Sequence, residues 1–117
     1  MSKEENLMQI IADAALEESA IELVILDVNE LTVIADYFVI CNGRNMVQIR
    51  SIAENVEKVV QEKEGILPLR RDGFQEGKWI ILDYGSTIFH VFRQEERDYY
   101  KLDKLWGDAK EVEVRLS

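Results

Sequence analysis

Histidine and cysteine are the side chains most often used for nucleophilic and acid–base chemistry, and this sequence contains one of each. His90 lies among Phe89, Val91 and Phe92 without the serine or cysteine of a nucleophile motif beside it, so a histidine-dependent triad is not supported. Cys41 lies inside an apolar run, which is typical of a small buried side chain. A single cysteine also excludes an intramolecular disulfide and a site built from several thiolates. These patterns predict no catalytic residue, and for His90 they favour a structural or binding role.

Three aspartates are the remaining candidates for metal chemistry, because Asp27, Asp36 and Asp83 each lie in or beside a predicted strand. Their carboxylates could converge on a divalent cation. None of them forms a carboxylate pair with one residue between at a strand end, and each also fits an ordinary role at a turn. Gly43 precedes a predicted helix, but one glycine without glycine-rich neighbours is a weak sign of a phosphate site. We therefore expect neither a metal nor a cofactor.

Aromatic and apolar side chains gather on one face of two neighbouring predicted strands. Strict alternation places Trp79, Ile81 and Asp83 on one face of the first strand, and His90 and Phe92 on one face of the second. If helices cover only the other face, an open apolar patch around the indole is left for another molecule, and tryptophan and tyrosine are prominent in protein interfaces. The predicted partner-binding residues are Trp79, Ile81, Asp83, Tyr84, His90, Phe92 and Tyr100.

Hydrophobic periodicity predicts the elements that must position this face. Apolar residues at helical spacing indicate a first helix that ends close to Ser19, and a longer one that Asn45 caps and Gly65 ends. Runs rich in β-branched residues predict strands at 21–28, 35–41, 67–71, 78–84 and 87–93.

The last predicted helix covers residues 94–105, with Glu95 and Glu96 in its first turn, where the helix dipole favours negative charge. The tail from about residue 110 alternates polar and apolar residues to Leu116, as a strand or a loosely docked end would. The residues expected to pack this helix on the sheet are Tyr99, Tyr100, Leu102, Leu105 and Trp106.

The order of these elements predicts one α/β (α+β) domain over residues 1–117. Strands 21–28 and 35–41 are joined by a short link and should pair antiparallel, and strands 78–84 and 87–93 should form a hairpin. The run 35–41 is apolar on both faces, which favours a central position. The simplest assembly is a single mixed five-stranded sheet with helices mainly on one face.

Charge narrows the class of partner. The chain has 14 basic and 23 acidic residues, a net charge of −9. Such a body is repelled by phosphate backbones, so we expect no direct nucleic-acid recognition, and a basic protein partner fits the sign. No leader peptide or apolar run of membrane-spanning length is visible, so we expect no membrane partner and a cytoplasmic location.

Several stretches of the chain carry a family pattern, in one order from about residue 5 to residue 109. They are Ala35-Asp36-Tyr37-Phe38-Val39-Ile40-Cys41-Asn42-Gly43, then Gln48, Trp79-Ile80-Ile81-Leu82-Asp83-Tyr84-Gly85, His90-Val91-Phe92, Glu96-Arg97, Tyr99-Tyr100 and Leu102-Asp103-Lys104-Leu105-Trp106-Gly107-Asp108-Ala109. Together they resemble the ribosomal silencing factors, also called the Iojap family.

The resemblance implies a non-enzymatic translational repressor that binds the large ribosomal subunit through large-subunit protein fourteen. It further implies that a factor bound to this protein blocks association with the small subunit and lowers translation under nutrient limitation. The resemblance also implies a fold related to the nucleotidyltransferases and a possible homodimer.

Two alternatives stay open. One is a metal-dependent enzyme of the nucleotidyltransferase type, with Asp36 and Asp83 holding magnesium near Gly43, although the carboxylate pair that such enzymes use after this turn is missing. The other is an assembly factor of the large subunit, which would use the same docking surface.

Overall fold

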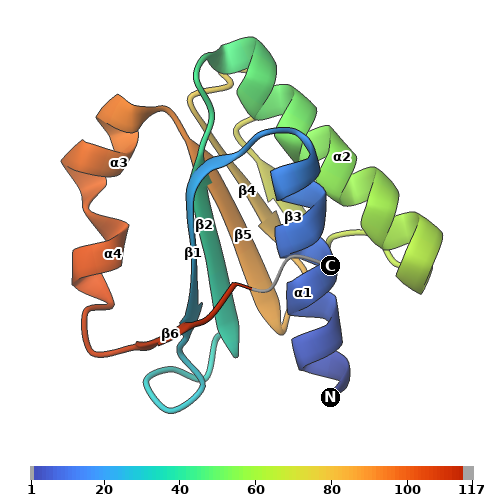
Figure 1. Cartoon of the computed structure of the whole chain (residues 1–117), viewed down its shortest axis with the longest axis vertical. Coiled ribbons are helices and arrows are strands. Elements are labelled where there is room, and N and C mark those ends of the chain that lie inside the picture. Colours follow the sequence, from blue (N-terminus) through green and yellow to red (C-terminus); the bar gives the residue numbers. More distant parts are fainter. Residues whose placement is uncertain (1, 115–117) are drawn as a thin grey trace.

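Six strands form one mixed sheet at the centre of the molecule (Figure 1). The computed structural model describes residues 2–114, without the side chains of Asp103 and Leu105. The strands are β1 (Ile21–Asp27), β2 (Tyr37–Asn42), β3 (Arg70–Asp72), β4 (Trp79–Asp83), β5 (Thr87–Phe92) and β6 (Lys110–Val112). Their order across the sheet is β3-β4-β5-β2-β1-β6. β2 and β5 are parallel, and the other neighbours pair antiparallel.

The mixed sheet, the antiparallel pair β1–β2, the hairpin β4–β5 and the central position of β2 confirm the sequence-based expectations. The number of strands differs by one, because the tail pairs with β1 through β6, with Leu26 opposite Glu111. The predicted alternation continues to Leu116, but residues 115–117 lie outside the described part of the chain.

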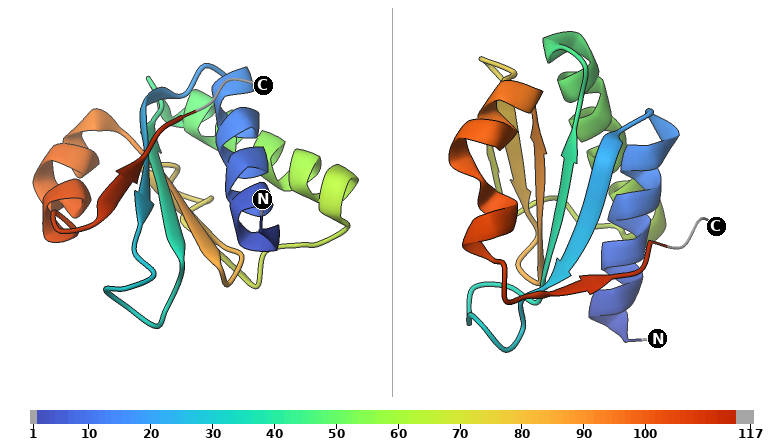
Figure 2. Two further views of the ribbon diagram at one scale, coloured as in Figure 1. Left: turned by 60° about the horizontal axis from the view of Figure 1, so that its bottom comes forward. Right: turned by 60° about the vertical axis from the view of Figure 1, so that its left-hand side comes forward.

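Two long helices, α1 (Lys3–Glu17) and α2 (Met46–Glu64), cover one face of the sheet (Figure 2). Ser2 and Glu5 form a capping box at the start of α1, and the Asn45 side chain accepts a hydrogen bond from the Gln48 backbone N–H at 2.8 Å. Gly65 ends α2 in the left-handed conformation, with φ 68°, as predicted.

The larger hydrophobic core lies between α1, α2 and the sheet. Its centre consists of completely buried side chains such as Ile11, Ile52 and Phe89. Cys41 is buried in this core, as predicted, and burial raises the pKa of its thiol. A raised pKa leaves the thiol protonated and unreactive, which agrees with a packing role.

The two long helices lie on one side of the sheet, which confirms the prediction of helices mainly on one face, but the opposite face is not bare. Two short helices, α3 (Gln94–Tyr100) and α4 (Leu102–Leu105), lie across it, opposite α1 and α2 (Figures 1 and 2). The sequence predicts one continuous helix here, but Lys101 has φ 49° and breaks it. Because of this break, Leu102 and Trp106 turn toward the sheet and pack against a second core cluster that contains Phe38.

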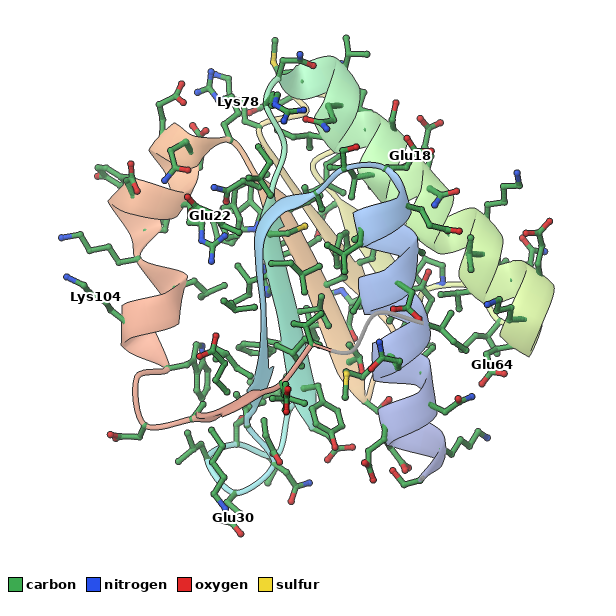
Figure 3. All side chains as sticks on the ribbon, viewed as in Figure 1. Glu18, Glu22, Glu30, Glu64, Lys78 and Lys104 are labelled. Atoms are coloured by element: carbon green, nitrogen blue, oxygen red, sulfur yellow. The ribbon has the colours of Figure 1, made fainter. Side chains whose placement is uncertain are left out.

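Some of the residues predicted to pack α3 and α4 on the sheet do so, and others are exposed to solvent. Leu102 and Trp106 pack as predicted, and Trp106 meets the Phe38 ring edge-on with centroids 5.1 Å apart. Tyr99 is 80% exposed, which corrects its expected packing, and Tyr100 is 52% exposed. The side chain of Leu105 lies outside the described residues. Lys104 points away from the sheet (Figure 3).

No helix within residues 2–114 is long and apolar enough to cross a membrane.

Candidate partner-binding site

An apolar groove of about 290 Å³ lies on the face of the sheet that carries α3 and α4, and we call it the β4–β5 groove. The short helices cover this face only in part, and Leu102 and Trp106 of the α4 region form one wall of the groove. The complete lining is Ile34, Phe38, Arg70, Asp72, Ile81, Asp83, Ile88, His90, Leu102 and Trp106. The surface that remains open is therefore apolar with a few charges, which suits recognition of another protein.

Three of the predicted partner-binding residues line this groove. Ile81 and Asp83 come from β4, and His90 comes from β5 directly opposite Ile81. Alternation along the antiparallel hairpin brings these side chains to one face, as the sequence indicates.

Trp79 lies beside the groove and not in its lining. Its half-buried indole stacks on Phe92 with ring centroids 4.8 Å apart, and Tyr100 of α3 lies at 4.8 Å from it. The indole Nε1–H donates a hydrogen bond to Nδ1 of His90 at 3.1 Å. Trp79 is thus partly covered by the chain's own α3 and is held in a fixed position by its neighbours.

Two of the predicted site residues, Phe92 and Tyr84, are buried within the chain. Phe92 is completely buried, because Trp79 stacks on its ring, so it supports the surface without being part of it. Tyr84 directly follows β4 and continues the alternation of Ile80 and Leu82, so its side chain is buried in the core on the side of α1 and α2. Burial also raises the pKa of Tyr84, whose hydroxyl has no hydrogen-bond partner within residues 2–114.

His90 is neutral at physiological pH. Burial lowers its pKa to about 4. Because an indole N–H can only donate, the bond from Trp79 requires a lone pair on Nδ1, and the ring proton therefore sits on Nε2. The phenylalanine ring of Phe38 packs edge-on against the imidazole at 5.5 Å. The aromatic neighbours thus fix both the orientation and the tautomer of this histidine.

The three aspartates that are candidates for metal chemistry accept hydrogen bonds in or near turns. Asp27 accepts a hydrogen bond from the Asn29 backbone N–H at 3.1 Å, and Asp83 accepts one from the Gly85 backbone N–H at 2.8 Å. Asp36 accepts a hydrogen bond from the Asn29 side chain. The part of the chain that the structure describes contains no group of three or more His, Cys, Asp or Glu side chains placed to hold a metal ion.

The enzyme alternative requires Gly43 to lie near Asp36 and Asp83, and the sheet separates them. Asp83 pairs with Ile88, which pairs with Phe38 near the start of β2, so both aspartates lie at that end of the sheet. Gly43 follows the other end of β2, about 20 Å away along an extended strand. This arrangement does not fit a shared magnesium site.

A larger cavity of about 460 Å³ lies at the edge where β1 and β2 join their connecting loop. Its lining is mainly polar and acidic, and it includes Asp27, Asp36 and Tyr37. None of the predicted partner-binding residues lines it. The smaller β4–β5 groove is the better candidate, because apolar surface is the part of an interface that gains most from burial.

A buried polar network attaches α3 to the sheet. The guanidinium of Arg97 donates hydrogen bonds to the backbone carbonyl of Glu22 at 2.7 Å and to Oδ1 of Asn42 at 3.0 Å. Asn42 is also buried, and its Nδ2 donates to Oε1 of Gln94 at 2.6 Å. Glu22 lies at a bulge in β1 and has φ 51° (Figure 3). The network therefore joins α3 to β1 and β2 beside the groove.

Sequence reasoning did not find this network. Asn42 and Arg97 are 55 positions apart, and no spacing rule connects them. The available signal was a single amide at the end of an otherwise apolar strand, because buried polar side chains need partners.

Comparison with protein families shows which family the chain belongs to. The family model described as "Ribosomal silencing factor during starvation" matches residues 1–117. The chain belongs to the ribosomal silencing factor family. Membership confirms the resemblance deduced from the sequence, and it confirms a regulatory protein, not an enzyme.

Two bacterial relatives share nearly the whole length of this silencing factor chain. Ribosomal silencing factor RsfS of Halalkalibacterium halodurans is 40% identical over 114 residues, which cover 97% of this chain and 96% of the relative. The protein of the same name from Bacillus subtilis is 37% identical over 106 residues, covering 91% and 89%.

Solved structures agree with the silencing factor fold. A crystal structure of a Bacillus halodurans protein superimposes with a TM-score of 0.83 at 34% identity, covering 94% of this chain and 99% of that one. A Chromobacterium violaceum protein superimposes with a TM-score of 0.87 over 99% of this chain and 95% of that one, and at 22% identity it supports the fold alone.

Proposed function

We propose that this silencing factor binds the large ribosomal subunit through large-subunit protein fourteen and thereby blocks association with the small subunit. Translation is repressed in this way when nutrients are limiting. The mechanism is steric, so it requires a stable docking surface and no active site.

The β4–β5 groove is the observation that carries this proposal. It combines apolar walls with the half-buried residues Ile81 and Asp83, on a face that α3 and α4 cover only in part. A stable protein interface needs roughly 800 Å² on each partner. The groove is too small to provide that area alone, and we assign it the role of the central pocket that receives an apolar anchor of the partner.

Charge supports a basic ribosomal protein as the partner. The net charge of −9 favours encounter with a cationic surface and disfavours close contact with ribosomal RNA. Two acidic side chains, Asp72 and Asp83, line the groove together with one basic one, Arg70. Because ribosomal subunits join in the cytoplasm, we propose that the protein acts there. A homodimer stays a prediction from the family resemblance.

Subunit binding and subunit joining test the proposal together. The full chain is mixed with purified large subunits and sedimented, and light scattering then follows joining after small subunits are added. We expect the chain to sediment with large subunits and to lower the scattering increase in proportion to its occupancy. Normal joining at saturating concentration of the chain would refute the proposal.

Ile81→Ala tests whether the groove is the docking surface. Removing most of this half-buried side chain from the groove should weaken subunit binding by about 1–2 kcal/mol. Tyr84→Phe is the matched control, because Tyr84 directly follows the same strand but packs in the other core. If the Ile81→Ala variant binds with the same affinity as the wild type, the interface lies outside the groove.

A further inference from the structure

His90 is the polar side chain buried in the wall of the β4–β5 groove. It is 7% exposed, and this remaining surface opens to the groove that it lines. Its Nδ1 accepts a hydrogen bond from Trp79 at 3.1 Å. Its Nε2 has no hydrogen-bond partner within residues 2–114. Unlike the hydroxyls of Tyr84 and Thr87, this ring nitrogen is not fully buried, so it faces the groove and marks a position where an acceptor atom of a ligand would be stabilising.

Trp79 determines which ring nitrogen carries the proton. Because the indole supplies a donor to Nδ1, the neutral imidazole must be protonated at Nε2. The groove therefore contains a hydrogen-bond donor whose direction is set before any partner arrives. Fixing the donor in advance removes part of the entropic cost of binding.

We propose that His90 Nε2–H donates a hydrogen bond to an uncharged carbonyl oxygen of the partner, next to the apolar side chain that fills the groove. The inference rests on the function proposed above and specifies the partner's chemistry at that site. It makes His90 a specificity-determining residue, and it makes Trp79 a positioning residue that acts through His90.

The charges around the groove favour a neutral acceptor over a carboxylate. Asp72 and Asp83 line the same groove, and Arg70 is the one basic residue of the lining. A carboxylate of the partner would face an excess of negative charge in a partly desolvated site. A backbone carbonyl meets no such repulsion and can accept the bond while its neighbouring side chain fills the apolar volume.

Nitrogen-15 spectra of the imidazole test the donor directly in the wild-type chain, with isolated large-subunit protein fourteen as the probe. We expect the Nε2-protonated tautomer in the free chain, and strong protection of the Nε2 proton from solvent exchange once the partner is saturating. An Nδ1-protonated ring in the free chain would overturn the inference. So would an Nε2 proton that exchanges equally fast in the complex.

Affinity measurements test the contribution of the bond. His90→Phe keeps a planar ring but removes the donor, and we expect about tenfold weaker binding. Tyr84→Phe, which removes a hydroxyl from the opposite core, should bind like the wild type. If His90→Phe binds with unchanged affinity, this inference fails while the proposed function stands. If the wild type itself does not bind, the proposed function fails and this inference with it. If His90→Phe does not fold, the spectra of the wild type decide.

Trp79→Phe tests the positioning role, because it keeps an aromatic ring on Phe92 but removes the donor to Nδ1. We expect the free variant to show a mixture of both imidazole tautomers. A ring that stays entirely protonated at Nε2 would show that Trp79 does not set the tautomer.

Discussion

Thr87 carries a buried hydroxyl at the start of β5 that has no hydrogen-bond partner among the described residues. An unpaired buried hydroxyl destabilises the folded state, because it loses its bonds to water without replacement. Thr87→Val keeps the shape and removes the polar atom, so we expect the free energy of unfolding to rise by about 1 kcal/mol. Urea unfolding measures the change. Thr87→Ala is the control, and it should be less stable than Thr87→Val because it also loses a methyl group.

His90 gives the fold a defined pH dependence. Its pKa is about 4 in the folded chain, because burial penalises the charged ring, and about 6.5 in the unfolded chain. The unfolded state therefore binds more protons between these values, and stability is lost as pH falls from about 6.5 to about 4. The expected loss is on the order of 3 kcal/mol, and further acidification adds nothing from this residue.

Urea unfolding of the wild type and of His90→Gln from pH 7 to pH 5 isolates this effect, because His90 is the one histidine in the chain. The charged residues that share the groove with it, Arg70, Asp72 and Asp83, are present in both proteins. We expect the wild type to lose stability across this range and the variant to lose much less. Parallel pH profiles would show that His90 is not held neutral.

At the scale of elements, α3 depends on one buried arginine. Arg97→Met removes the hydrogen bonds to Glu22 and Asn42 and leaves buried polar atoms without partners. We expect a loss of about 3 kcal/mol in the free energy of unfolding and faster hydrogen exchange in α3. Arg93→Met is the control, because Arg93 pairs with Glu96 at a half-buried position at the start of α3, and its loss leaves no buried polar atom of the sheet without a partner, so it should matter less. If both substitutions lower the free energy of unfolding equally, the Arg97 network does not specifically stabilise the attachment of α3.

Some boundaries of the helices are determined by nearby residues, and others depend on tertiary packing. The start and end of α2 follow from Asn45 and Gly65, whose preferences act within a few residues, and both were predicted. The break between α3 and α4 was not, because Lys101 is an ordinary helix former and adopts φ 49° in the segment whose Leu102 and Trp106 pack on the sheet. Alternation placed Ile81 and Asp83 on the face that carries the β4–β5 groove, but alternation alone could not show that Phe92 is buried beneath Trp79.

At the scale of the whole molecule, net charge should govern how quickly the protein finds its partner. An acidic chain and a basic ribosomal protein attract each other over a distance that salt shortens. Raising the salt concentration from about 0.05 M to about 0.5 M should slow association with large subunits strongly and change dissociation little. Stopped-flow measurements separate the two rates. Association that is independent of salt would argue against a basic partner surface.

The amino-acid sequence by itself determined five of the six strands, the two long helices and the family, because these depend on residue type, on short-range periodicity and on ordered motifs. Only the tertiary structure decided that α3 and α4 lie across the second face and leave a groove between them and β4–β5. It also decided that Trp79 turns toward His90 and that Arg97 reaches Asn42. These contacts join residues distant in sequence, and side-chain packing selects them after the backbone pattern is already fixed.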